Sequence, residues 1–148
     1  MSSFEELLVR DGKLIYKTKG VSMRPLLHQN RDLVIIEVPK GRLKVNDVAF
    51  YKRGMDYVLH RVIKVNKDSY VIRGDNTYRI EIVPDSAILG VLTSFVHKGK
   101  LVSIKNPLYQ CYVRIWNYLY PLRYFLVRCR RIPGYAKRRV LKKRDTTK

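Results

Sequence analysis

The chain has 148 residues, the length of one domain, which is enough to bury a hydrophobic core. Its two cysteines, Cys111 and Cys129, predict neither a disulfide framework nor a metal site, and no zinc-binding or Gly-rich phosphate-binding motif occurs, so we expect no metal and no cofactor. The net charge is +19, and residues 105–148 hold thirteen Lys and Arg against one acidic residue. This distribution favours an anionic partner.

The first residues predict a short helix and then a strand. Ser2 and Ser3 each have a glutamate three residues later, the spacing of a helix capping box, so residues 2–8 should be helical. The same stretch lacks the apolar run of a signal peptide, and we expect neither a secretory signal nor an N-terminal anchor. Asp11-Gly12 then predicts a turn into a strand over residues 13–19.

The middle of the chain predicts many short strands separated by close turns. Turn signals occur at residues 39–41, 53–54, 66–68 and 97–100. The strands expected between them cover residues 32–38, 47–53, 57–65, 70–73, 82–83, 88–96 and 101–104. This pattern favours a mainly β fold, an all-β barrel or sandwich-like core with few helices.

From residue 107 the composition changes to an aromatic and basic segment. Residues 108–128 contain fifteen apolar residues, and their polar positions form one stripe of a helix that Pro121 should kink. Arg114 and Arg123 lie inside this stretch, and each central arginine costs about 2.5–3.5 kcal/mol on insertion into a bilayer. We therefore expect an amphipathic helix on an anionic membrane surface, followed from Arg130 by a disordered basic tail. Spanning of the membrane by residues 108–128 is the alternative.

Three short boxes place a serine, a histidine and a carboxylate in order along the chain. They are Gly20-Val21-Ser22-Met23-Arg24-Pro25, Leu59-His60-Arg61 and Gly74-Asp75-Asn76. A serine hydroxyl is a poor nucleophile at neutral pH, and it needs a base within hydrogen-bond reach and a third group that orients that base. The order therefore suggests nucleophilic catalysis.

The boxes resemble those of the signal peptidase I and LexA-like serine peptidase superfamily, over residues 17–91. In that superfamily the nucleophile sits in a Ser-Met pair, the base precedes an arginine on a later strand, and a Gly-Asp box follows. The base is histidine in the endoplasmic-reticulum-like branch, and His60 holds that position. The resemblance implies a β-rich peptidase core. Together with the change of composition at residue 107, it divides the chain into an expected core over residues 1–106 and a membrane-surface segment and tail over residues 107–148.

The resemblance also implies a role for each site residue. Ser22 would be the nucleophile, His60 the general base and Asp75 the group that orients it, with Glu81 as the nearest candidate for the second acid of the family. Many relatives carry an oxyanion-binding serine two residues before the nucleophile. Because Gly20 stands there, the oxyanion hole would rest on the backbone N–H of Ser22 and a second donor that the sequence does not identify.

Each of the three residues also has a purely structural interpretation. Ser22 could cap a helical turn, His60 could be a strand residue on a partly polar surface, and Asp75 could belong to an ordinary turn. Lys52 and Lys64 are alternative bases, as in the LexA-like branch, but neither holds the box position. His28 and His97 lie in predicted turns without a matching box. Arg61 and Arg73 are expected to be structural ion-pair partners.

The sequence therefore predicts a serine endopeptidase that cleaves a signal, leader or precursor peptide at the cytoplasmic face of the membrane, as a peripheral protein. Two alternatives remain open. One is a LexA-like self-cleaving regulator, which would need a DNA-binding domain, and no segment of that length precedes Ser22. The other is a noncatalytic basic protein that binds a membrane or a nucleic acid, for which the basic tail alone would suffice; of these two partners, nucleic acid is the less expected.

Overall fold

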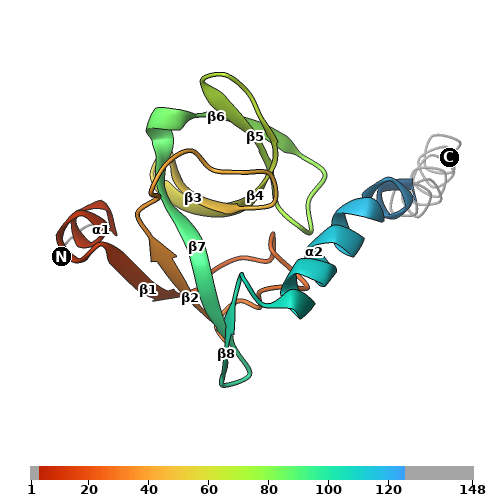
Figure 1. Cartoon of the computed structure of the whole chain (residues 1–148), viewed down its shortest axis with the longest axis horizontal. Coiled ribbons are helices and arrows are strands. Elements are labelled where there is room, and N and C mark those ends of the chain that lie inside the picture. Colours follow the sequence, from red (N-terminus) through yellow and green to blue (C-terminus); the bar gives the residue numbers. More distant parts are fainter. Residues whose placement is uncertain (1–3, 126–148) are drawn as a thin grey trace, which may run out of the picture. The chain divides into compact units, whose positions relative to one another are not determined.

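The structure, a computed structural model, describes residues 4–125 (Figure 1). It is mainly β, as the sequence predicts. The elements are α1 (Phe4–Asp11), β1 (Lys13–Lys17), β2 (Leu33–Glu37), β3 (Val48–Arg53), β4 (Asp56–Val65), β5 (Ser69–Arg73), β6 (Ile80–Pro84), η1 (Asp85–Ala87), β7 (Ile88–His97), β8 (Lys100–Ser103) and α2 (Pro107–Tyr118). The chain divides into two compact units, residues 1–111 and 112–148.

All strands of the first unit belong to one antiparallel sheet in the order β1-β2-β7-β3-β4-β5-β6, with β8 paired to β7. The long strand β7 lies between β2 and β3 in this order. It pairs with β2 and β8 through residues 91–97 and with β3 through residues 88–91 (Figure 1). Register shifts interrupt the β2–β7, β3–β7 and β4–β5 pairs. Such bulges bend strands and increase their twist, so the sheet curves around its core.

One cluster of the hydrophobic core lies inside the curve formed by β3, β4, β5 and β6. It contains side chains from alternate positions of these strands and from the loop before β3. The buried members are Leu43, Ala49, Tyr51, Val58, Val62, Tyr70, Ile72 and Val83. Tyr51 and Tyr70 bring phenol groups into this largely apolar region, and the Tyr51 hydroxyl takes part in the site described below.

A two-residue turn fixes the register of β3 against β4. Arg53 pairs with Asp56, and Gly54 between them has φ +61°, a conformation that glycine adopts at low cost. A shift of one residue would move every side chain of the strand to the opposite face. The turn therefore places Ala49 directly opposite His60.

The strand predicted for residues 13–19 ends at Lys17, because the chain leaves the sheet there and turns towards Ser22. Gly20 has φ +84° and allows this change of direction. The predicted helix over residues 2–8 is Phe4–Asp11, and Ser2 and Ser3 lie outside the described residues. The remaining predicted strands agree with the observed ones to within two residues at most ends.

Helix α2 begins at a favourable N-terminal sequence. The Asn106 side chain accepts a hydrogen bond from the backbone N–H of Leu108 at 2.8 Å, and Pro107 occupies the first helical position, where its missing N–H costs nothing. The regular helix ends at Tyr118, three residues before Pro121, and residues 120–125 are again helical. Residues 126–148, which include the end of the predicted helix and the basic tail, lie outside the described residues.

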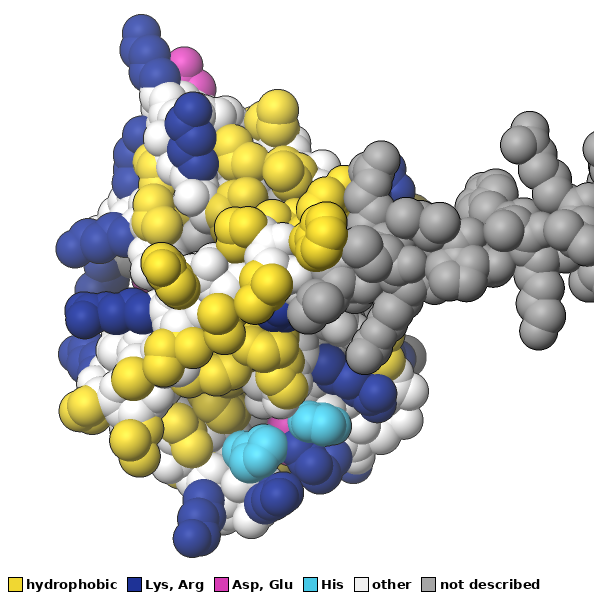
Figure 2. All heavy atoms as spheres, turned by 90° about the vertical axis from the view of Figure 1, so that its right-hand side faces the viewer, with side chains coloured by type: hydrophobic (Ala, Val, Ile, Leu, Met, Phe, Trp, Pro, Cys, Tyr) yellow, Lys and Arg dark blue, Asp and Glu magenta, His cyan; other side chains and the backbone are white. Residues whose placement is uncertain are grey.

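Lys and Arg predominate over Asp and Glu on the face shown in Figure 2. Hydrophobic side chains are also exposed over a wide area of this face. No helix within residues 4–125 is long and apolar enough to cross a membrane.

Candidate active site

Ser22 lies in a compact turn that follows Gly20. Within this turn the N–H of Arg24 donates to the carbonyl of Val21 at 3.2 Å, and the N–H of Leu27 donates to the carbonyl of Met23 at 2.9 Å. The peptide bond between Arg24 and Pro25 is cis. Met23 and Leu27 are buried, whereas Ser22 is half-buried, so the hydrophobic residues anchor the turn and present the serine.

The Gly74-Asp75-Asn76 box holds the Ser22 turn from the other side. The backbone N–H of Asn76 donates to the carbonyl of Ser22 at 2.7 Å, and the Asn76 side-chain amide donates to the carbonyl of Val21 at 3.2 Å. The turn that carries the serine is thus fastened to the loop between β5 and β6. The sequence predicts the two boxes as parts of one site, and the structure brings them into contact.

Gly74 is the point at which Ser22 and His60 come together. A Cβ atom at Gly74 would lie 2.7 Å from the carbonyl oxygen of Ser22 and 3.1 Å from Cδ2 of His60. The first distance is shorter than real Cβ contacts and the second is tighter than most of them, so glycine is the residue that fits here without a shift of its neighbours. Because Cδ2 is bonded to Nε2, the ring edge that carries Nε2 is the one near Gly74, the residue that lies against the Ser22 carbonyl. Among residues 4–125, no hydrogen bond joins the Ser22 hydroxyl to His60.

The other ring nitrogen of His60 is held by Tyr51 and Glu81. The Tyr51 hydroxyl lies 3.2 Å from Nδ1 of His60 and donates its hydrogen to Oε2 of Glu81 at 3.0 Å. A phenol has one hydrogen to donate, so the contact with His60 requires Nδ1–H to donate to the tyrosine oxygen. Neutral His60 is then the Nδ1–H tautomer, and its Nε2 carries the free lone pair that a general base needs.

The charges and the burial around His60 act in opposite directions. Burial lowers its pKa, the Glu81 carboxylate raises it, the Arg53 guanidinium lowers it and the Asp75 carboxylate raises it; the net result is a pKa below the ordinary value. Glu81 lies 3.8 Å from Nδ1 and itself pairs with Arg53 at 2.7 Å. A lowered pKa keeps the imidazole neutral, and so able to accept a proton, at neutral pH.

Asp75 occupies a different place from the one expected. Both of its carboxylate oxygens accept hydrogen bonds from the Arg61 guanidinium, at 2.7 Å and 2.6 Å, and both side chains are buried. The position beside Nδ1 of His60 belongs instead to Glu81 and Tyr51. Asp75 is close enough to influence the His60 pKa, but its direct partner is the arginine of the His60 box. Arg61 is an ion-pair residue, as the sequence predicts.

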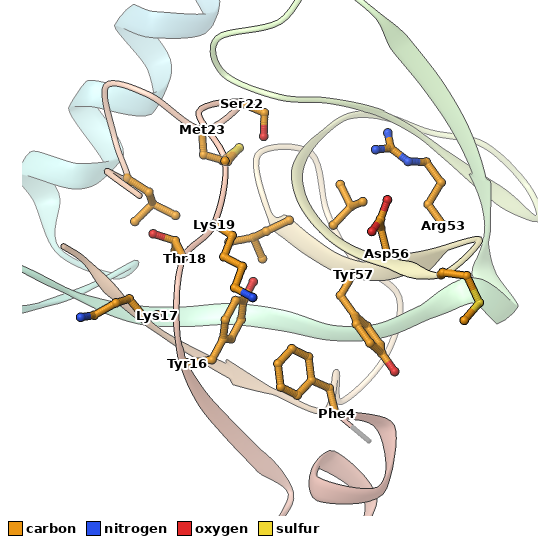
Figure 3. A pocket seen from close by; sticks show the side chains of 15 residues that line it. Phe4, Tyr16, Lys17, Thr18, Lys19, Ser22, Met23, Arg53, Asp56 and Tyr57 are labelled. Atoms are coloured by element: carbon orange, nitrogen blue, oxygen red, sulfur yellow. The ribbon is translucent and has the colours of Figure 1, made fainter. Parts of the chain in front are cut away.

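A cleft of about 720 Å³ begins at Ser22. Figure 3 shows Ser22 at one end, with its hydroxyl directed towards the space, and Phe4 at the other end. One wall is the segment from Tyr16 to Met23 and the opposite wall is the start of β4. Lys19, Arg53 and Asp56 add charges to a lining that is otherwise rich in apolar groups. The volume is in the range of ligand sites and would accept several residues of an extended peptide.

The alternative bases and the remaining histidines are engaged elsewhere. Lys52 pairs with Glu5 at 2.8 Å, and Lys64 is exposed on β4. His97 contacts the buried carboxylate of Asp32 at 3.2 Å, and its ring centroid lies 6.3 Å from that of His28. Neither these side chains nor the His60 ring is among the residues that line the cleft. What distinguishes His60 is its close approach to Gly74, which also lies against the Ser22 carbonyl.

Sequence reasoning missed Tyr51 because its role depends on strand pairing. It stands two residues beyond Ala49, the partner of His60, on the same face of the sheet. Diagonal neighbours on adjacent strands are within reach of long aromatic side chains. The Arg53-Gly54 turn signal, which sets this register, was the available clue.

Comparison with known proteins gives no matching family model and no matching curated protein. The chemistry assigned to the site therefore depends on the geometry of its residues.

Proposed function

We propose that this protein is a serine endopeptidase that cleaves a signal, leader or precursor peptide. Ser22 is the nucleophile and His60 is the general base. The observation that carries the proposal is the orientation of His60: Tyr51 and Glu81 hold its Nδ1–H, and the ring edge that bears the free Nε2 lies near Gly74, the residue that lies against the Ser22 carbonyl. A histidine held this way is prepared to accept a proton from a serine hydroxyl.

The reaction would proceed in two steps. In the first, Ser22 Oγ attacks the peptide carbonyl as Nε2 of His60 takes the hydroxyl proton, and His60 then gives that proton to the leaving amine. In the second, His60 activates a water molecule that hydrolyses the acyl-enzyme. Glu81, acting through Tyr51, stabilises the imidazolium that forms in each step. A small rotation of the Ser22 side chain on substrate binding would complete its hydrogen bond to His60, since such contacts are often loose without substrate.

The backbone N–H of Ser22 is suited to the developing oxyanion. Within residues 4–125 it donates to no protein acceptor, and Ser22 is one of the residues that line the cleft. A backbone donor placed at the oxyanion contributes about 2.7–4 kcal/mol to the stabilisation of the transition state. The cleft supplies the room for the substrate, and the superfamily resemblance implies small residues before the scissile bond.

The test is cleavage of a diverse mixture of synthetic peptides, read by mass spectrometry. Ser22→Ala should abolish cleavage, since loss of the nucleophile removes the acyl-enzyme route; removal of a catalytic triad residue costs up to about 10⁶-fold in kcat. Ser86→Ala, which changes an exposed serine in η1, is the matched control and should cleave as the wild type does.

Equal cleavage by wild type and Ser22→Ala would disprove the proposal. No cleavage by the wild type of any peptide, in the mixture or in its own chain, would favour the noncatalytic alternative. A loss of mass from the chain itself, abolished by Ser22→Ala, would favour the self-cleaving alternative.

A further inference from the structure

The helical segment after residue 107 carries a row of exposed apolar side chains. Ile115 is 52% exposed, Tyr118 84%, Leu122 55% and Phe125 62%. Their spacings of three, four and three residues place all four on one side of a helix. Towards the start of α2, Leu108 and Cys111 continue the same spacing and are also exposed. We call Ile115, Tyr118, Leu122 and Phe125 the apolar stripe.

Arginines border the apolar stripe on both sides. Arg114 is exposed and precedes Ile115, and Arg123 follows Leu122. The Arg123 guanidinium lies over the Trp116 ring, 3.5 Å from its centroid, and the Tyr112 and Trp116 rings stack at 5.7 Å. Long arginine side chains and amphipathic aromatic rings are the groups that tolerate the boundary between lipid tails and headgroups. The bordering residues therefore fit a lipid surface.

The net charge of residues 105–148 indicates which kind of partner could cover the apolar stripe. Residues 105–148 carry a net charge of +12, so a second copy of this chain would bring like charge against like charge. An anionic lipid surface attracts the same charges, and it also offers an apolar layer to the stripe. We propose that the apolar stripe docks in the plane of an anionic lipid surface, with Arg114 and Arg123 reaching the headgroups. This proposal does not rest on the proposed peptidase activity.

The test compares binding of the full chain to phosphatidylcholine vesicles with and without phosphatidylglycerol. Wild type should bind the anionic vesicles, and binding should weaken as salt rises. Ile115→Gln/Leu122→Gln should weaken binding to anionic vesicles at least about tenfold, because burial of even one apolar side chain is worth about that factor. The double variant retains every basic residue, so this loss reports the apolar stripe and not the tail.

Two controls separate this effect from unfolding and from catalysis. Tyr124→Gln removes an exposed aromatic residue of the same segment from outside the stripe, and it should bind as the wild type does. Ser22→Ala should also bind as the wild type does.

Three outcomes would overturn the proposal. The first is a wild type that does not bind anionic vesicles, and the second is a double variant that binds them as tightly as the wild type does. The third is a wild type that sediments as a dimer while the double variant sediments as a monomer. The last would assign the stripe to a second copy of the chain.

Discussion

The hydrogen-bond partners of His60 decide which of its ring nitrogens carries the proton. Tyr51 donates to Glu81 and therefore accepts from Nδ1–H of His60, which leaves Nε2 basic. The arrangement has the parts of a serine–histidine–acid site, with a tyrosine between the histidine and the acid. If the acid contacted the histidine directly, it would orient the ring by itself; here Tyr51 and Glu81 orient the ring together.

The charges beside His60 predict opposite shifts in the pH dependence of peptide cleavage. Activity should rise as His60 loses its proton, with a midpoint below the ordinary histidine pKa. Glu81→Gln removes a charge that raises the pKa of His60 and should move the midpoint to lower pH. Arg53→Gln removes a charge that lowers it and should move the midpoint to higher pH. The measurement is kcat/KM against pH for both variants.

Arg10→Gln is the control for this pair, because it removes an exposed cation whose partner is Asp11 and not a residue of the site. Its midpoint should stay at the wild-type value. Shifts of the two site variants in the same direction would contradict the assignment of His60 as the base. A profile that rises only in the range of a lysine would do so as well.

At the scale of elements, the site is a junction between loops and strand edges. The Ser22 turn follows β1, His60 is on β4, and the loop between β5 and β6 holds both through Gly74 and Asn76. Hydrogen bonds and close packing hold this loop against the turn, so the separation of the reacting groups depends on the space available at residue 74.

Gly74→Ala should therefore reduce cleavage without altering any reacting group. The new methyl group would press on the Ser22 carbonyl and on the His60 ring, and a misplacement of about 1 Å in a catalytic site costs on the order of 10²-fold in rate. Gly41→Ala is the matched control, because a Cβ there meets nothing within 4 Å. We would measure kcat/KM and thermal unfolding of both. Activity of a folded Gly74→Ala protein close to that of wild type would refute this geometry.

At the scale of the whole molecule, the buried Arg61–Asp75 pair joins segments that are distant in sequence. The Arg61 guanidinium binds Asp75, donates to the Asn46 carbonyl at 2.9 Å and donates to the Tyr109 hydroxyl at 3.2 Å. Burial lowers the pKa of Arg61, but the Asp75 carboxylate and the Tyr109 hydroxyl together outweigh burial, and the pKa is raised above its ordinary value. The pair thus connects β4, the loop before β3, the loop after β5 and the first turn of α2.

Asp75→Asn should lower the free energy of unfolding by about 3–5 kcal/mol, because it leaves the Arg61 charge buried without its counter-ion. The measurement is urea unfolding followed by circular dichroism. Asp56→Asn, at an exposed position, is the control and should change stability by less than about 0.5 kcal/mol. A loss below about 1 kcal/mol for Asp75→Asn would mean that the pair does not support the fold in this way.

The sequence by itself determined the strands, since turn residues and short β-branched runs specify them locally, as in residues 57–65 against the observed Asp56–Val65. It also identified Ser22, His60 and Gly74 as candidate site residues, because each lies in a short motif of adjacent residues. Only the tertiary structure decided the partners of these residues. Strand register and sheet curvature place Tyr51 and Glu81 beside His60, and they place Asp75 beside Arg61.

The same division applies to α2. Its periodicity predicts a helix and Pro121 predicts an interruption, because both are properties of the local chain. Which side of the helix remains exposed depends on what packs against it, and short-range sequence patterns do not contain that information. The exposed row proved to be Ile115 and Tyr118 of α2 with Leu122 and Phe125 of the helical residues that follow it, which only the folded chain could distinguish from the other apolar residues of the segment.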